Sequence, residues 1–251
     1  MPREPASRRI IRWIVFVASA AGAALILRFT WDQPLVSAGL LLLIGVVVLV
    51  RWIARRRLRR ALVSGNVEEV LREWSSTIAR APHASTMAPL MTATAFAANG
   101  WTEQARAALA VAQRGPAWEA ALEHRLFLDT LLLTFEGDRE EALRQAERMA
   151  RLPMPSAPPP MRERIELMRG ALGAFARAFA HQSRNGDSDL LERVAVQSPL
   201  VHWAMRYASA IVAIDQGDKE RARMLLKGAP EWPTESAFRG FHEELAARAQ
   251  G

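Results

Sequence analysis

The stretch Leu122–Ala150, LEHRLFLDTLLLTFEGDREEALRQAERMA, contains one complete unit of the pattern that decides the fold. Apolar residues recur every three or four positions on both sides of Gly137, which predicts two amphipathic helices. Gly137 can adopt the left-handed conformation that ends the first helix, and Asp138 can cap the second. Asp138 and Glu141 also have the spacing of a capping box. The stretch therefore predicts a helix–turn–helix unit.

Four other turns repeat this pattern, and their glycines are Gly65, Gly100, Gly186 and Gly217. A small or apolar residue follows five positions after each of the five glycines: Val70, Ala105, Ala142, Leu191 and Ala222. We expect this residue to face the preceding helix, where a large polar side chain would keep the two helices apart. Asp218, like Asp138, is placed to cap the helix after its turn. Helix pairs of this kind bury their apolar faces by stacking on one another.

The segments between these turns are also helical in pattern. Before Gly186, apolar residues recur at spacings of three and four: Ile165, Met168, Leu172, Phe175 and Phe179. No segment after residue 61 alternates with period two for long enough to predict a strand. The sequence therefore predicts an all-α fold. A final helix reaching about Ala249 is expected to seal the stack, with Thr234 as its cap and Trp232 as an exposed or capping aromatic residue.

Two apolar segments near the N-terminus predict a membrane anchor. Trp13–Leu27 has fifteen residues without a charge, and Pro34–Val50 has seventeen. With their flanking residues, both can cross the roughly 30 Å hydrocarbon core of a bilayer as helices. The alternatives are a cleaved signal peptide for the first segment and a buried soluble hairpin for both. The second long apolar run, which has no polar face, favours two spans.

The charge distribution predicts the orientation of these spans. Residues 1–60 contain eleven Arg and two acidic residues, a net charge of +9, whereas the rest of the chain has a net charge of −2. The basic excess therefore flanks the apolar segments and does not indicate nucleic-acid binding. By the positive-inside rule both termini are cytoplasmic. Anionic lipid headgroups are the expected partners of the juxtamembrane arginines Arg51, Arg55, Arg56, Arg57, Arg59 and Arg60.

These features predict five parts of the chain. They are a cytoplasmic segment 1–9, transmembrane helices 10–31 and 32–54, a basic linker 55–64 and a cytoplasmic helical repeat domain 65–251. The Arg- and Ala-rich composition is typical of a bacterial genome, so the expected location is the bacterial inner membrane.

Motifs for catalysis are missing from the sequence. The chain has no cysteine, which excludes disulfides, zinc–thiolate sites and a cysteine nucleophile. Its five histidines are scattered, and none has the paired spacing of metal ligands. Phosphate-binding glycine loops and the nucleophile elbow of hydrolases are also absent. We therefore expect no enzyme activity, no cofactor and no metal.

The repeat turns resemble those of the tetratricopeptide repeat family over roughly residues 62–230. The resemblance is carried by Gly137–Ala142, by Gly217-Asp218 with Ala222, and by Asn99-Gly100 with Ala105 and Ala112. It implies an α-solenoid whose concave face binds peptides or helices of other proteins. The chain departs from the family in its irregular repeat spacing, in a proline-rich insertion at 153–160, and in lacking most aromatic residues of the first helix. An irregular helical bundle is the alternative. In layout alone, two spans followed by such repeats resemble the HemY-type bacterial membrane proteins.

The expected function is that of a membrane-tethered adaptor or scaffold for protein–protein interaction. Its partner groove is expected along the first helix of each pair, with the charged residues Glu123, Arg125, Arg162 and Arg206 at its surface. The alternative is a structural accessory subunit that assembles into a membrane complex mainly through its transmembrane helices. The expected partners are a protein that the sequence does not name and membrane lipids, with self-association left open.

Overall fold

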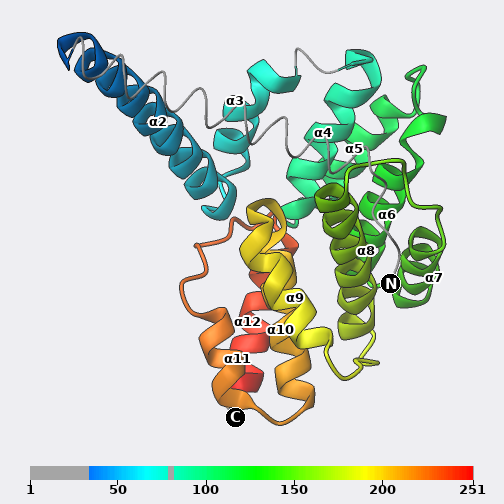
Figure 1. The fold of residues 1–251 in the computed structure, drawn as a ribbon. Helices are drawn as coiled ribbons and strands as arrows, with labels where there is room; N and C mark the ends of the chain where they lie inside the picture. The colour runs from blue at the N-terminus through cyan, green and yellow to red at the C-terminus, as the bar shows by residue number, and fades with distance from the viewer. Residues whose placement is uncertain (1–33, 79–81, 251) are drawn as a thin grey trace, which may run out of the picture. The chain divides into compact units, whose positions relative to one another are not determined.

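The computed structural model describes residues 34–78 and 82–250, and every regular element within them is a helix (Figure 1). The α-helices are α2 Pro34–Val63, α3 Val67–Ile78, α4 Ala84–Ala98, α5 Thr102–Ala112, α6 Leu122–Glu136, α7 Arg139–Ala150, α8 Pro159–Phe179, α9 Asp187–Gln197, α10 His202–Asp215, α11 Lys219–Leu226 and α12 Ala237–Gln250. Two short 3-10 helices, η1 Glu119–Ala121 and η2 Pro199–Val201, precede α6 and α10. The prediction of an all-α chain is confirmed for the described residues.

The chain divides into two compact units, Met1–Arg57 and Leu58–Gly251. The first is described only from Pro34, so the predicted segment 1–9 and the first predicted span, 10–31, lie outside the described residues. In the part of α2 that belongs to this unit, the apolar residues between Leu41 and Val50, apart from Gly45, are each 47–70% exposed. Within 34–78 and 82–250, no helix combines the length and the apolar character that crossing a membrane requires.

The second unit, which we call the helical unit, is built from the predicted helix pairs. The two helices of each pair pack against each other in α4–α5, α6–α7, α8–α9 and α10–α11. The first helices form a continuous row, because α4 packs on α6, α6 on α8, and α8 on α10. Each second helix also packs on the first helix of the next pair, as α5 does on α6 and α7 on α8. The pairs therefore stack in the order of the sequence.

The turns between paired helices have the geometry that their glycines require. The φ angles of Gly65, Gly100, Gly137, Gly186 and Gly217 lie between 76° and 90°, in the left-handed region. The residue five positions after each glycine is buried. The Asp138 carboxylate accepts a hydrogen bond from the Glu141 amide at 3.1 Å, and Asp218 accepts one from the Arg221 amide at 2.9 Å. These caps satisfy amide groups that would otherwise lack a partner at the helix start.

Two turns differ in detail from the sequence expectation. The Glu141 side chain binds Arg144 and Gln145, so Asp138 and Glu141 form only one of the two hydrogen bonds of a capping box. At the fourth turn, α8 is followed by His181 in the left-handed conformation, with φ 55°, and Gly186 instead stands immediately before α9. Residues 180–186 thus separate the end of α8 from the start of α9.

The predicted linker 55–64 is the C-terminal end of α2, which continues as one helix to Val63. Ala61 and Leu62 are buried in the helical unit. The Trp203 indole donates a hydrogen bond to the Val63 carbonyl at 2.8 Å and so satisfies one of the unpaired carbonyls at the end of α2. The last turns of α2 are thus part of the packed structure.

Residues 229–236, which belong to the connection between α11 and α12, fold back onto the first repeats, and we call them the strap. The Ser236 hydroxyl donates to the Asn99 carbonyl at 2.7 Å, and the Ala237 amide donates to the Gly100 carbonyl at 2.9 Å. Trp232 is 7% exposed and packs over Gly65. The first and last repeats therefore touch, which the sequence pattern did not predict, because neighbour-to-neighbour stacking makes no such contact.

Helix α12 seals the stack through an aromatic cluster. Phe238 at its start lies with its ring centroid 5.2 Å from that of Phe135, 5.1 Å from that of Tyr207 and 4.9 Å from that of Trp232. The Trp232 indole donates to the Tyr207 hydroxyl at 2.6 Å, so Trp232 is a buried capping residue and not an exposed one. The expected cap Thr234 is wrong, since α12 begins at Ala237 and the Ser236 hydroxyl accepts from the Phe238 amide.

Candidate binding groove

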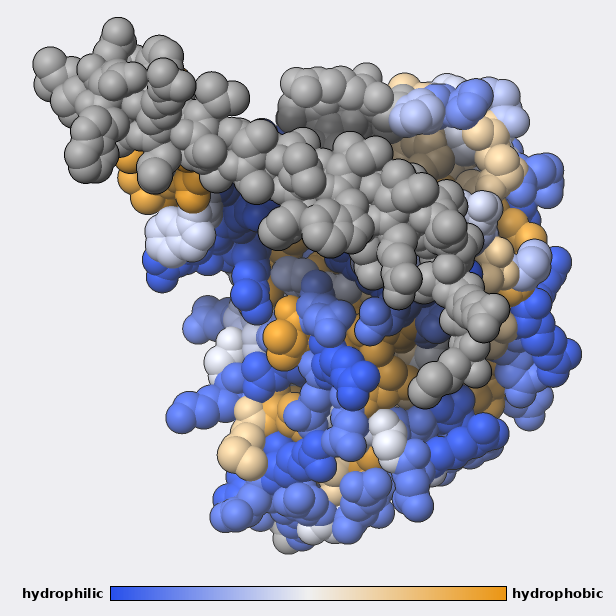
Figure 2. Space-filling model, in the orientation of Figure 1, coloured by the Kyte–Doolittle hydropathy of each residue, from blue (hydrophilic) through white to orange (hydrophobic). Residues whose placement is uncertain are grey.

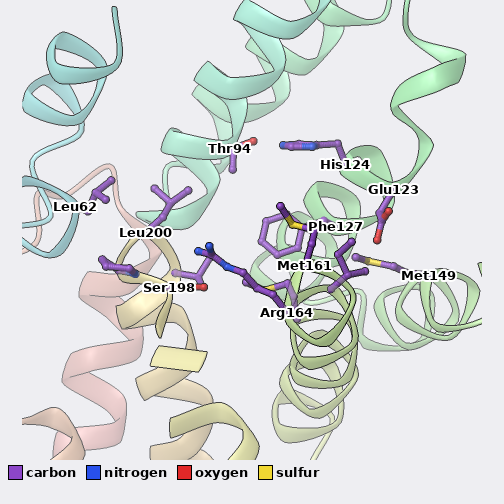
Figure 3. A pocket seen from close by; sticks show the side chains of 14 residues that line it. Leu62, Thr94, Glu123, His124, Phe127, Met149, Met161, Arg164, Ser198 and Leu200 are labelled. Carbon is purple, nitrogen blue, oxygen red and sulfur yellow. The ribbon is translucent and has the colours of Figure 1, made fainter. Parts of the chain in front are cut away.

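An apolar groove opens on the row of first helices in the helical unit. Its volume is about 460 Å³. The residues that line it come from the end of α2, from α4, α6, α7 and α8, and from the connection into α10: Leu62, Thr94, Glu123, His124, Phe127, Met149, Met161, Arg164, Ile165, Met168, Ser198, Pro199, Leu200 and Val201. In Figure 3, Leu62, Leu200 and Ser198 lie at one end, and Met149 and Glu123 at the other. This size and lining are typical of a binding site.

The N-terminal half of α8 supplies one wall. Met161, Ile165 and Met168 follow one another at spacings of four and three residues, so their side chains share one face of the helix. Met161 is 52% exposed, whereas Ile165 and Met168 are half-buried. Methionine side chains are unbranched and polarizable, and they adapt to differently shaped partners. The wall can therefore accept apolar side chains of more than one shape.

The floor of the groove is buried, so the groove has a fixed base. Leu62, Thr94, Met149 and Val201 are each at most 8% exposed. The Thr94 hydroxyl donates to the Leu90 carbonyl within α4 at 2.8 Å, so this polar group is satisfied within its own helix. Figure 2 shows hydrophobic patches among hydrophilic residues on the visible part of the face seen in Figure 1. At the groove itself, Glu123, His124 and Arg164 add polar groups to the apolar lining, and interaction surfaces commonly combine the two.

Glu123 lies at one end of the groove, but its charge is already neutralised. The Arg169 guanidinium on α8 donates to the Glu123 carboxylate at 2.8 Å, and it also donates to the Leu152 carbonyl at 2.8 Å. The Arg169 side chain is only 6% exposed. A buried guanidinium held by a carboxylate and a carbonyl fixes the positions of its partners. Arg169 therefore ties α6 and the loop after α7 to α8 beside the groove.

Arg164 is the second charged residue of the lining, and its situation is different. It lies on the same helix as Met161 and Met168 and is exposed to solvent. Its guanidinium makes no ion pair with any residue that the structure describes, although Glu163 and Glu166 are close in sequence. With Glu123 neutralised by Arg169, Arg164 is the charge of the lining that no described residue pairs.

His124 is open to the groove at its surface and surrounded by protein on its other sides. Loss of solvation by these walls lowers the pKa of His124, and the neighbouring Glu123 carboxylate opposes that shift. The imidazole is therefore neutral at pH 7, when one ring nitrogen donates and the other accepts hydrogen bonds. His124 contributes a polar contact to the groove without a second positive charge.

The groove wall on the other side from α8 is formed by η2, and a hydrogen bond from His202 fixes its position. The His202 ring donates from Nδ1 to the Ala195 carbonyl at 2.8 Å, which links the end of α9 to the start of α10 across η2. Burial lowers the pKa of His202, the nearby cations Arg206 and Arg59 lower it further, and the bond to Ala195 opposes them. His202 is thus neutral in the folded protein at pH 7.

The four charged residues expected in a partner groove do not lie together. Glu123 lines the groove. Arg162 is exposed on α8 and is not part of the lining. The Arg125 guanidinium stacks over the Trp118 ring at 4.2 Å. Arg206 donates to the carbonyls of Leu225 and Met224 at 2.6 and 2.7 Å, so it caps the end of α11. Reversing the charge of Arg206 would therefore disturb the fold.

The groove residues that the sequence reasoning missed are mostly apolar. Ile165 and Met168 belong to the helical apolar pattern before Gly186, and Met161 extends that spacing by one more step toward the N-terminus. A stripe of this kind predicts burial but does not show whether the covering element belongs to the same chain. The three methionines on two helices were the available signal, because methionine is common at adaptable binding surfaces.

The remaining expected sites lie outside the groove or belong to the turns. The six juxtamembrane arginines from Arg51 to Arg60 are all exposed on α2. Within that part of α2, the Arg56 guanidinium stacks over the Trp52 ring at 5.1 Å. Among the described residues, no group of three or more His, Asp and Glu side chains is arranged to hold a metal ion.

Comparison with known proteins provides no further guide to the groove. No family model matches this chain, and no curated protein or solved structure compared with it matches either.

Proposed function

We propose that the chain is a membrane-tethered adaptor that binds a partner protein in the groove of its helical unit. The observation that carries the proposal is the apolar groove along α4, α6 and α8, which is open among the residues that the structure describes. An open apolar groove of about 460 Å³ with polar groups in its lining favours association with another molecule. The tetratricopeptide-like turns support a protein as that molecule.

The membrane part of the proposal rests on the sequence of residues 10–54 and the exposure of the apolar run on α2. Residues such as Leu42 and Val48 are 70% and 60% exposed, which is unfavourable in water and favourable in a bilayer. The arginines that follow would lie at an anionic headgroup surface on the cytoplasmic side. A tether of this kind raises the effective concentration of a bound partner beside the membrane.

The test compares two methionine variants of the full chain, purified with its partner in mild detergent. Met161→Glu places a carboxylate in the groove, whereas Met224→Glu places one on α11, outside the groove, at a side chain that is 65% exposed. Because both side chains are exposed, both variants should fold normally. Met161→Glu should lose the partner, and Met224→Glu should retain it.

Two results would contradict the proposal. If both variants retain the partner equally, the groove is not its binding site. If the anchor alone, residues 1–60, retains the partner, the chain is an accessory subunit that assembles through its N-terminal segments.

A further inference from the structure

We infer that the groove binds an amphipathic α-helix of the partner, which docks its apolar face along the N-terminal half of α8 and directs a carboxylate toward Arg164. The inference rests on the proposed function and names the class of partner. Three observations on the helical unit carry it: the way the chain covers the other half of α8, the exposure of the groove, and its charge.

The first observation is that helices of the same chain already cover the other half of the same stripe. Toward the C-terminal end of α8, Leu172, Phe175 and Phe179 continue the three- and four-residue spacing and are buried. The Phe179 ring lies 5.3 Å from that of Phe241 on α12. Phe135 of α6 lies against both Phe175 and Phe179, with ring centroids 5.7 and 6.1 Å away, so α6 and the Phe241 ring of α12 cover this half of the stripe. The open half offers the same kind of ridge to a second helix, supplied by another protein.

The second observation is that the groove is open to solvent along its length. Met161, Arg164 and His124 are all exposed, so an occupant would keep a large part of its own surface in water. A lipid acyl chain is unfavourable there, because sites for small apolar ligands enclose most of the ligand. An amphipathic helix suits an open groove, since its apolar anchors at i, i+3 or i+4, and i+7 enter the groove while its polar face stays in water.

The third observation concerns charge. Arg169 neutralises Glu123 at 2.8 Å, while Arg164 has no ion-pair partner among the residues that the structure describes. A partner carboxylate would compensate Arg164 by a charge-assisted hydrogen bond, and a partner lysine would meet an uncompensated like charge. The groove should therefore prefer helices with an acidic residue beside their apolar anchors.

The experiment selects binders for the full chain in nanodiscs from an mRNA-display library of random peptides, each about 18 residues long so that it can form a helix. Parallel selections use Arg164→Glu, Met161→Glu and, as a matched control, Met224→Glu. Only peptides that bind the unaltered chain and not Met161→Glu are analysed. These should show the helical spacing of apolar residues and an excess of Asp and Glu over Lys and Arg.

Individual peptides then give the size of the effect. Replacing the selected acid by Lys should weaken binding to the unaltered chain roughly tenfold, and binding to Arg164→Glu should show the reverse preference. Selected peptides without helical spacing, or an acid preference that Arg164→Glu leaves unchanged, would overturn the inference. Displacement of the peptides by oleate at concentrations below its micelle formation would also overturn it, in favour of a lipid site.

These results are separate from the test of the proposed function. Met161→Glu could still lose the natural partner while the selected peptides lack helical spacing. In that case the adaptor proposal stands and only the inferred class of partner is wrong.

Discussion

The two halves of α8 have the same sequence pattern and different surroundings. One apolar stripe runs from Met161 to Phe179 at spacings of three and four residues. Leu172 and Phe175 in the C-terminal half are 0% exposed, whereas Met161 in the N-terminal half is 52% exposed. The difference lies in what covers each half, because Phe135 of α6 and Phe241 of α12 lie against the phenylalanines of the C-terminal half.

This comparison shows that periodicity alone does not separate a core from an interface. Within residues 34–78 and 82–250, the strap joins the first and last repeats and the end of α8 is buried, yet the beginning of α8 is exposed. Methionine replaces leucine and phenylalanine in that open half, which suits a surface that must accept another molecule. The comparison predicts that substitutions in the two halves affect different properties.

The largest expected effect is on stability in the covered half. Phe175→Ala should lower the free energy of unfolding by about 3–5 kcal/mol, because it removes a fully buried aromatic ring from the cluster with Phe135 and Phe179. Met161→Ala should change it by less than about 0.5 kcal/mol. Urea unfolding of both variants in the same detergent, followed by circular dichroism, measures the difference. Similar losses for the two variants would mean that the groove is part of the core.

A second, smaller effect is expected where the strap covers a turn. Gly100→Ala should be strongly destabilising, because the left-handed backbone costs about 1–2 kcal/mol for alanine and crowding adds about 1–3 kcal/mol. The added Cβ atom would lie 2.8 Å from the Ser236 hydroxyl and 3.0 Å from the Phe238 amide nitrogen.

Gly217→Ala is the matched control for this effect. Its φ is 79°, close to the 77° of Gly100, but the added Cβ atom meets nothing within 4 Å. Only the backbone contribution should remain, so thermal unfolding should occur at a higher temperature than for Gly100→Ala. Equal midpoints would show that the strap does not press on the Gly100 turn in solution.

The smallest expected effect is a pH dependence of the unfolding free energy, which arises from His202 beside η2. Burial keeps the pKa of His202 below its ordinary value of 6.5, so the unfolded chain binds the proton more readily than the folded one. The contribution of His202 to stability is therefore complete above about pH 7 and is lost as the pH falls through 6.5 toward the lower, folded pKa. We expect this loss to be smaller than the effects of the Phe175 and Gly100 substitutions.

His202→Gln tests this prediction, because its amide can still donate to the Ala195 carbonyl but does not titrate. The variant should show a flatter dependence of unfolding free energy on pH between 7 and 5, in the range where histidine titrates. A slope identical to that of the unaltered chain would show that His202 is not the responsible group.

The repeat turns could be predicted from the sequence because they depend on local chemistry. Glycine is needed at a positive φ, aspartate caps the following helix, and Val70, Ala105 and Ala142 are small or apolar because a neighbouring helix lies against them. These requirements are confined to a few consecutive residues, so the pattern shows them directly.

The strap and the groove could not be predicted in the same way. The Ser236–Asn99 hydrogen bond joins residues 137 positions apart, and no local pattern encodes such a contact. The groove residues expected from the sequence were charged ones on first helices. In the structure, Arg125 stacks over the Trp118 ring and Arg206 donates to the Leu225 carbonyl at the end of α11. An arginine on a helix surface can bind its own fold or a partner, and only the packed structure separates the two cases.

Site-specific photo-crosslinking can show whether the exposed half of α8 contacts another protein in the cell. A photoreactive amino acid would replace Met161 in one version of the full chain and Met224 in another, with both expressed in their native membrane. Both positions are exposed, so general collisions should label them alike. The account predicts a discrete crosslinked protein from position 161 that is absent from position 224 and disappears when Arg164→Glu is added. Identical crosslinking from the two positions, or none from position 161, would contradict it.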